Sequence, residues 1–509
     1  MQPHSFNFIS METILIKTLQ FLLSLSLLVA LHEGGHFLFA KLFKTRVSRF
    51  YLFANWGFHL FSTYDDWFRK LCHKPLITER GDEGQNFFQW VRNQYYQLTG
   101  QKDKVKTKNI GNKVYHPEHG TEYGIGWLPI GGYVSIMGMI DETNQKLSSE
   151  PQPWEFRSKP AWQRLLIMLG GVIMNFIIAF AIYAGVLYTW GESYVKTTDM
   201  TYGMKFNEQA KADGFRDGDI MLGVDDQTFD DWNVNHIRDL SNAHVAHVQR
   251  EGKPIDIPLS GEMNLLEMLE EPRYIDALVP LNIDSIVAGS PAESIGLQRG
   301  DIITSLNEES INDFNDLQQK LASLRNGLSE SSMHADSLRA RTITIGIEGR
   351  DSIVKTTLTS DFTLGFVNKM PDYKVTTREY GFWESIPAGI TYAGSILGGY
   401  VNDLKYIFTK KGARSVGGFV TIGNIFPAEW DWYKFWMLTA FLSIILGFMN
   451  VLPIPALDGG HALFAIYEII TGKKPSDKFL ERAQYVGMFL LLALLIFANL
   501  NDILRLFGI

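Results

Sequence analysis

The sequence holds a single cysteine, Cys72, among 509 residues. One cysteine excludes intramolecular disulfide bonds and any zinc site built from cysteine ligands. The apolar segment near the N-terminus also lacks a strongly basic start and a small-residue cleavage site, which are the marks of a cleaved secretion signal. We therefore expect this segment to be retained.

Hydrophobic residues make up 46% of the chain and are concentrated in a few segments. Four stretches are long and apolar enough to be membrane-embedded helices: residues 13–40, 162–190, 433–453 and 484–506. A long region of soluble composition separates the second stretch from the third. The predicted fold class is a multi-span α-helical membrane protein with four transmembrane helices.

Charge predicts how these helices are oriented. Lys and Arg outnumber Asp and Glu in residues 41–160, whereas acidic residues predominate in residues 191–380. Basic residues also lie between the last two spans, at Lys473, Lys474 and Lys478. Since basic loops tend to stay in the cytoplasm, we expect residues 41–160 there, and both termini and the acidic region on the opposite side.

Residues 32–36 form the pattern His-Glu-Gly-Gly-His at the end of the first apolar stretch. Histidines four apart share one face of a helix, so His32 and His36 can bind one metal ion, and Glu33 can act as general base on a zinc-activated water. Ionisable residues within a membrane segment are costly and usually functional. The competing interpretation is a polar cluster whose side chains reach the lipid headgroups.

A third metal ligand is expected where the third span ends, in the run Asn-Val-Leu-Pro-Ile-Pro-Ala-Leu-Asp-Gly-Gly-His at residues 450–461. Two prolines break the helix there and expose backbone groups in or near the membrane. Asp458 can supply a carboxylate ligand. Alternatively, Asp458 caps the next helix and His461 is the ligand. Chemistry alone leaves both alternatives open.

Two segments after the first span are expected to form strands. Residues 47–61 alternate aromatic and small side chains, and residues 123–134 are too rich in glycine and proline for a spanning helix. Non-helical backbone at membrane depth persists only against protein or a wet cavity. We therefore expect membrane re-entrant β-hairpins beside the metal site.

The soluble region contains an internal repeat with an offset of 82 residues. Residues 210–220 align with residues 292–302, and each copy has a Gly-x-x-x-Gly-Asp-Ile turn, a strand and then a helix. Such spacing predicts two duplicated small α+β domains. They resemble PDZ domains, whose fold commonly captures an extended peptide by strand addition.

Taken in order along nearly the whole chain, these motifs resemble the site-2 protease family of intramembrane metalloproteases, in particular its bacterial RseP-type members with two PDZ domains. The resemblance implies Zn²⁺ as cofactor. It implies these site residues: zinc ligands His32, His36 and Asp458, catalytic base Glu33, and substrate-binding residues Asn450, Gly131, Gly132 and Tyr133. Two features depart from the family pattern: the usual Gly-Pro-x-x-Asn of the second span lacks its proline between Gly171 and Asn175, and residues 62–120 form an insertion.

The resemblance implies an enzyme of the bacterial inner membrane that cleaves transmembrane segments of single-span proteins, such as anti-sigma factors or remnant signal peptides. Its other expected partners are membrane lipid and, at the PDZ-like domains in the periplasm, peptides or ectodomains. No nucleic acid is expected as a partner. A non-proteolytic PDZ-bearing scaffold and a metal transporter are the alternatives.

The expected domains are a first span with the start of the β region (1–61), an insertion (62–122), a β region and loop (123–160), a second span (161–191), two PDZ-like domains (192–275 and 276–365), an amphipathic membrane-surface region (366–432) and two final spans (433–509).

Overall fold

The computed structural model describes residues 11–73, 87, 90–92, 120–129, 131–139, 151–327, 334–350, 353–407 and 409–506. Most of the insertion expected at 62–122 therefore lies outside the described residues. The chain divides into two compact units. The first unit joins Met1–Gly191 to Glu379–Phe507, and the second is Glu192–Arg378.

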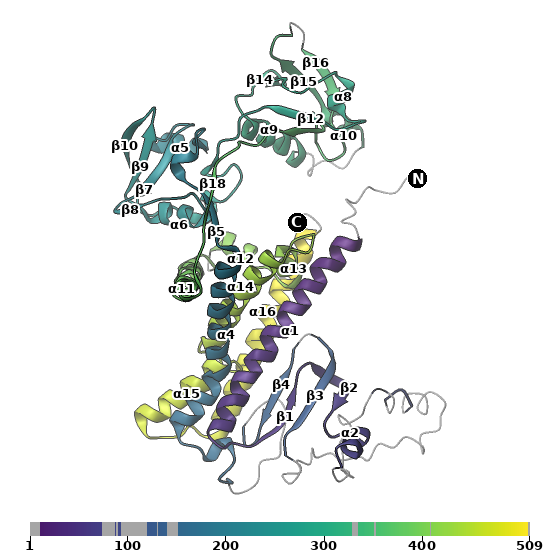
Figure 1. The fold of residues 1–509 in the computed structure, drawn as a ribbon, viewed down its shortest axis with the longest axis vertical. Helices are drawn as coiled ribbons and strands as arrows, with labels where there is room; N and C mark the ends of the chain where they lie inside the picture. Colours follow the sequence, from purple (N-terminus) through teal and green to yellow (C-terminus); the bar gives the residue numbers. More distant parts are fainter. Residues whose placement is uncertain are drawn as a thin grey trace. The chain divides into compact units, whose positions relative to one another are not determined.

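Within the described part of the first unit, four helices are long and apolar enough to cross a membrane. They are α1 (Met11–Leu42), α4 (Ala161–Trp190), α14 (Trp432–Val451) and α16 (Asp477–Leu506). They coincide with the four stretches expected from the sequence, so the multi-span fold class is confirmed. Helix α4 is central, because it packs against both α1 and α14 (Figure 1).

Small residues allow α1 and α4 to cross closely. A Cβ atom added to Gly35 would lie 2.2 Å from the carbonyl oxygen of Gly170, and one added to Gly170 would lie 2.8 Å from the carbonyl oxygen of Gly35. Glycine pairs of this kind let helix backbones approach inside a membrane. The crossing lies beside His36 and thereby brings α4 against the His-Glu-Gly-Gly-His segment.

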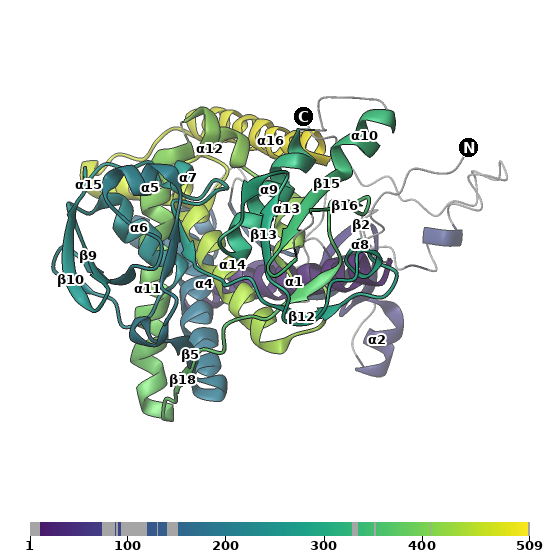
Figure 2. The same cartoon turned by 90° about the horizontal axis from the view of Figure 1, so that it is seen from above.

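The other helices in the described part of the first unit are α2 (Asp66–Leu71), η4 (Phe156–Ser158), α11 (Phe382–Ile407), α12 (Lys410–Ser415), α13 (Phe419–Ile425) and α15 (Asp458–Thr471). Helix α11 runs beside α4 (Figure 2). Its Gly389 permits this contact, since a Cβ atom there would lie 2.5 Å from the backbone nitrogen of Ala184.

The two β segments expected after the first span are strands, and they interleave into one four-stranded sheet instead of forming separate hairpins. Its order is β2 (Ala54–Ser62), β3 (Glu122–Leu128), β1 (Val47–Tyr51) and β4 (Tyr133–Ile136). Strand β1 pairs in parallel with β3 and antiparallel with β4. The sheet is fixed to α1 and α4 by a buried apolar cluster that includes Ala40, Val47, Ile136 and Ile167.

The second unit contains two similarly built halves, which we call the first repeat (residues 204–277) and the second repeat (residues 283–368). The strands of the first repeat are β6 (Met204–Phe206), β7 (Ile220–Val224), β8 (Gln227–Thr228), β9 (Val245–Arg250), β10 (Lys253–Pro258) and β11 (Ile275–Ala277). Those of the second repeat are β12 (Ile283–Ile286), β13 (Ile303–Leu306), β14 (Glu309–Ser310), β15 (Thr342–Ile347), β16 (Val354–Thr357) and β17 (Phe366–Asn368). The four-stranded sheets β10-β9-β7-β8 and β14-β13-β15-β16 have equivalent orders.

Helices α5 (Glu208–Asp213), α6 (Val234–Asn242) and α7 (Leu265–Met268) belong to the first repeat, and α8 (Pro291–Ser294), α9 (Phe314–Asn326) and α10 (His334–Arg341) to the second. The unit also includes β5 (Glu192–Val195), η5 (Thr197–Asp199) and β18 (Val375–Arg378). Strand β17 pairs with β12, and β18 pairs with β5. Both pairings lie within this unit, which ends at Arg378.

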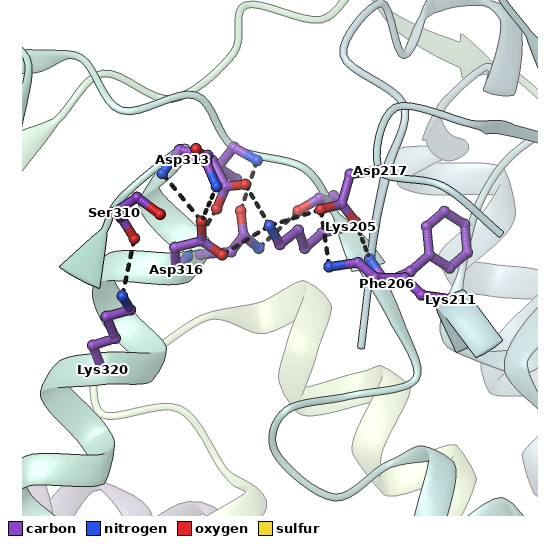
Figure 3. Close-up of polar contacts among 12 residues, drawn as sticks. Lys205, Phe206, Lys211, Asp217, Ser310, Asp313, Asp316 and Lys320 are labelled. Carbon is purple, nitrogen blue, oxygen red and sulfur yellow. Dashed lines mark hydrogen bonds and ion pairs between the residues drawn. The ribbon is translucent and has the colours of Figure 1, made fainter. Parts of the chain in front are cut away.

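An ion-pair cluster joins the two repeats (Figure 3). The Nζ atom of Lys205 on β6 lies 2.7 Å from Asp313 and 2.8 Å from Asp316, which begin α9, and 2.9 Å from Asp217 of its own repeat. Beside it, the side chain of Asn315 accepts a hydrogen bond from the backbone of Val279 and donates one to the carbonyl of Ala277. The start of α9 therefore holds both the first repeat and the segment that follows it.

Candidate active site

His32 and His36 lie one turn apart on α1, and both side chains are buried. Their Nε2 atoms are 3.2 Å apart, and the two rings meet edge to face. The spacing of four residues places the two rings on one side of the helix, as the sequence predicts. The apolar run of α1 thus presents two imidazole nitrogens at a single point.

Asp458 reaches the same point from the other end of the chain. After α14 ends, the backbone turns through Ala456, whose φ of 81° is in the left-handed region, and α15 begins at Asp458. One carboxylate oxygen, Oδ2, lies 3.1 Å from Nε2 of His32 and 3.3 Å from Nε2 of His36. Of the two alternatives that the sequence leaves open, the structure brings Asp458 to the histidines, and His461 is not part of the group.

Glycines make this turn possible. A Cβ atom on Gly459 would lie 2.2 Å from the carbonyl oxygen of Val451, and one on Gly460 would lie 2.5 Å from that of Ile454. The first turn of α15 therefore packs directly on the backbone of the proline segment. Larger residues would push α15 away and move Asp458 with it.

The three side chains suit a zinc ion. Ligand atoms about 2.05 Å from a tetrahedral zinc ion are separated from one another by about 3.3 Å, and the observed separations are 3.1, 3.2 and 3.3 Å. Oδ2 of Asp458 is buried and has no hydrogen-bond partner among the described residues, although two imidazole nitrogens face it. A cation bound between the three ligand atoms would compensate the burial of this carboxylate oxygen. Two histidines and a carboxylate also form a donor set that zinc commonly uses.

Glu33 and Asn450 flank this group. Oε2 of Glu33 accepts a hydrogen bond of 2.9 Å from the backbone N–H of Val134 on β4. The side-chain nitrogen of Asn450, in the last turn of α14, lies 3.5 Å from Nε2 of His32. A carboxylate next to the histidines and outside their triangle is placed to exchange protons with a water or substrate group there.

The edge strand of the sheet, β4, faces Glu33. In the described part of the sheet β4 pairs only with β1, so the N–H of Val134 points away from the sheet, to Glu33. Tyr133 stacks on Tyr51 with ring centroids 5.4 Å apart. Gly132 lets the backbone before β4 lie close to β1, since a Cβ atom on Gly132 would lie 2.5 Å from the carbonyl oxygen of Tyr51. At Gly131 a Cβ atom would meet nothing within 4 Å, so the backbone before β4 is accessible.

Helix α4 contributes three groups that the sequence analysis did not identify as part of the site. The carbonyl oxygen of Ile167 lies 2.8 Å from Nδ1 of His36, and the side-chain amide of Asn175 lies 3.1 Å from Nδ1 of His32. Between them, a Cβ atom on Gly171 would lie 2.5 Å from both rings. Two sequence signals mark this shared face: the spacing of four residues from 167 to 171 to 175, and the Gly-x-x-x-Asn that remains of the family pattern at Gly171 and Asn175.

A concave region lies in the second repeat. It has a volume of about 410 Å³ and lies between α9 and residues 361–366, with Leu317, Leu321, Phe362 and Phe366 among its lining side chains. Its walls are an amphipathic helix and the segment that leads into strand β17. Such a groove can accept an extended apolar peptide.

Comparison with known proteins gives a consistent result. The sequence model of peptidase family M50 matches residues 98–494. "Regulator of sigma E protease" of Haemophilus influenzae is 26% identical over 422 residues, which cover 76% of this chain and 88% of the relative. "Protease RseP" of Yersinia pestis is 26% identical over 416 residues, with the same coverage. "Putative zinc metalloprotease RC0203" of Rickettsia conorii is 23% identical over 504 residues, which cover 97% of this chain and 100% of the relative.

Proposed function

This chain belongs to peptidase family M50, and from that membership we propose that it is an intramembrane zinc endopeptidase that cleaves the transmembrane segments of single-span membrane proteins. The observation that carries the proposal is the convergence of His32, His36 and Asp458 beside Glu33, at the end of a helix long and apolar enough to cross a membrane. Ionisable groups within membrane-spanning helices are costly and usually functional.

In this proposal His32, His36 and Asp458 hold the zinc ion, and Glu33 is the catalytic base. The chemistry supplied by a bound zinc ion is Lewis acidity, which makes water more acidic and polarises a scissile carbonyl. Glu33 takes a proton from the attacking water and later delivers it to the leaving amine. The hydrogen bond from Val134 holds the carboxylate of Glu33 in position for both transfers.

A substrate helix hides its scissile amide in its own hydrogen bonds, so it must be unwound before cleavage. The outer edge of β4 offers backbone groups that can pair with the opened segment as an added strand. We assign Gly131, Gly132 and Tyr133 to this pairing and Asn450 to a hydrogen bond with the substrate backbone. Support comes from the open space at Gly131 and the short distance between β4 and Glu33.

The two repeats are proposed to be PDZ-like domains that contact the ectodomain or a released end of the substrate. The groove of the second repeat supports a peptide-binding role. Because residues 191–380 are acidic and residues 41–160 are basic, we propose that the repeats and both termini are periplasmic and that the active site lies toward the cytoplasmic side of a bacterial inner membrane. Anti-sigma factors and remnant signal peptides are candidate substrates.

The test uses the full-length protein, reconstituted in liposomes with a single-span model substrate. Cleavage should stop with a zinc chelator and return with added zinc. Glu33→Gln should lower the rate by at least about 100-fold, since general acid–base groups contribute roughly that much, while the zinc content stays unchanged. The matched control is Glu12→Gln, which alters an exposed carboxylate in the first turn of the same helix and should leave the rate unchanged.

Cleavage that continues in the chelator or in Glu33→Gln would exclude this mechanism and favour the scaffold. Metal transport into the same liposomes without any cleavage would favour a transporter instead.

A further inference from the structure

Metal binding through Nε2 requires the proton of each imidazole to be on Nδ1. A neutral imidazole carries one N–H, and the nitrogen without it binds the metal. In this structure the Nε2 atoms of both His32 and His36 face Asp458. Each Nδ1–H therefore needs an acceptor on the side away from the metal group, and that side is occupied by α4.

For His36 the acceptor is a backbone carbonyl. Nδ1 lies 2.8 Å from the carbonyl oxygen of Ile167, and a carbonyl can only accept, so the proton of His36 is on Nδ1. In an α-helix the side chain four residues later leans back over this carbonyl. That residue is Gly171, and its missing side chain leaves the carbonyl and both rings in contact.

For His32 the partner is the side chain of Asn175. This side chain is fully buried, and its amide nitrogen, in this placement, lies 3.1 Å from Nδ1 of His32. The amide oxygen, in this placement, is buried and has no hydrogen-bond partner in the described part of the chain. Nitrogen and oxygen of an amide are distinguished only by their hydrogen-bond partners. When Nε2 of His32 is free to bind a metal, Nδ1 of His32 carries the proton and donates it. The amide of Asn175 is therefore turned so that its oxygen faces Nδ1.

We propose that Asn175 is a positioning residue for the metal site. Its amide oxygen accepts the hydrogen bond from Nδ1–H of His32 and so fixes the tautomer and the ring orientation that present Nε2 to zinc. Together with the carbonyl of Ile167 and the space at Gly171, it makes one face of α4 the support of both histidines. The inference rests on the proposed role of His32 as a zinc ligand.

The helix pairing gives this support its rigidity. Ser443 of α14 donates a hydrogen bond of 2.8 Å to the backbone carbonyl of Asn175 itself. Position 175 is thus held from two sides, by α14 at its backbone and by α1 at its side chain. The two contacts can be removed separately, which provides a matched control.

The experiment measures zinc affinity of the full-length protein in detergent by competition with a chromogenic chelator. Asn175→Leu keeps the size of the side chain but removes the acceptor, and the affinity should fall by about 10- to 100-fold, the usual effect of losing a hydrogen-bond partner of a metal ligand. Asn175→Asp retains an acceptor and should bind zinc within a few-fold of the parent. Ser443→Ala removes only the backbone contact and should also remain within a few-fold.

An affinity of Asn175→Leu equal to that of Ser443→Ala would overturn the inference, as would an equal loss in Asn175→Asp and Asn175→Leu. If the leucine variant does not elute as a single species, Asn175→Ala is judged by the same criteria. His32→Ala separates this result from the proposed function: if it binds zinc like the parent, the ligand assignment itself is wrong, whereas loss in His32→Ala with none in Asn175→Leu refutes only the role of Asn175.

Discussion

Replacement of Lys205 by alanine should loosen the contact between the two repeats. The ammonium group of Lys205 is the shared partner of Asp217, Asp313 and Asp316 at 2.7–2.9 Å (Figure 3). Its side chain is only 12% exposed. Lys205→Ala would leave three carboxylates close together without a cation, so both desolvation and mutual repulsion oppose the closed arrangement.

The magnitude follows from burial. Removal of one partner from a fully buried ion pair costs about 3–5 kcal/mol. Here Asp313 is 5% exposed, Asp316 is 16% exposed and Asp217 is 29% exposed, so water can solvate part of the freed charge. We expect a cost of about 2–3 kcal/mol for local opening. That corresponds to a rise of roughly 30- to 150-fold in the opening equilibrium.

Hydrogen exchange of the full-length protein in detergent measures this opening directly. Peptides that cover residues 204–217 and 311–326 should lose protection by that factor, while peptides from α4 should not change. The control is Lys211→Ala in the neighbouring helix. Lys211 is 35% exposed and lies 3.3 Å from Asp217, so its removal should cost no more than about 0.5 kcal/mol.

Equal protection in the two variants would refute the reasoning, because it would mean that the cluster contributes no more than an ordinary surface ion pair.

Three other predictions concern pH, the metal site and the sheet edge. Burial alone would raise the pKa of Asp316, but hydrogen bonds from Lys205 and from Asn312 outweigh burial and hold that pKa below 3.8. The ionised carboxylate therefore stabilises the folded protein above that pH, and this stabilisation is lost as the pH falls below it. Pepsin cleavage within residues 311–326 should rise between about pH 5 and 2, and should rise less in Asp316→Asn. Gly171→Ala places a methyl group 2.5 Å from both histidine rings and should lower zinc affinity by at least about 10-fold, whereas Gly185→Ala on the same helix, with nothing within 4 Å, should not; equal affinities would refute the crowding argument. Val134→Pro removes the N–H that holds Glu33 and should lower cleavage by about 10-fold or more at unchanged zinc content, with Val134→Ala near the parent rate.

The features that the sequence predicts well are those that depend on local pattern. The four spans follow from the length of apolar runs, and the facing of His32 and His36 follows from a spacing of four residues on one helix. Chemistry alone leaves the third ligand open between Asp458 and His461, because the choice depends on how the chain turns after α14; the family resemblance favours Asp458. The left-handed backbone at Ala456 and the close packing of Gly459 decide that turn, and neither is visible as a pattern.

The groups of α4 that contact the two histidine rings could not be predicted from the sequence pattern alone, because two of these three groups do not act through a side chain. Ile167 acts through its backbone carbonyl, and Gly171 acts through the space that it leaves. Both groups reach the histidine rings only because of the register in which α4 crosses α1. The contact of Gly35 with Gly170 fixes this register. A shift of α4 by one residue would rotate its face by about 100° and carry the carbonyl and the amide away from the rings. The glycine contact at the crossing therefore selects which residues of α4 can serve the metal site, and the Asn175 experiment tests that register as well as the hydrogen bond.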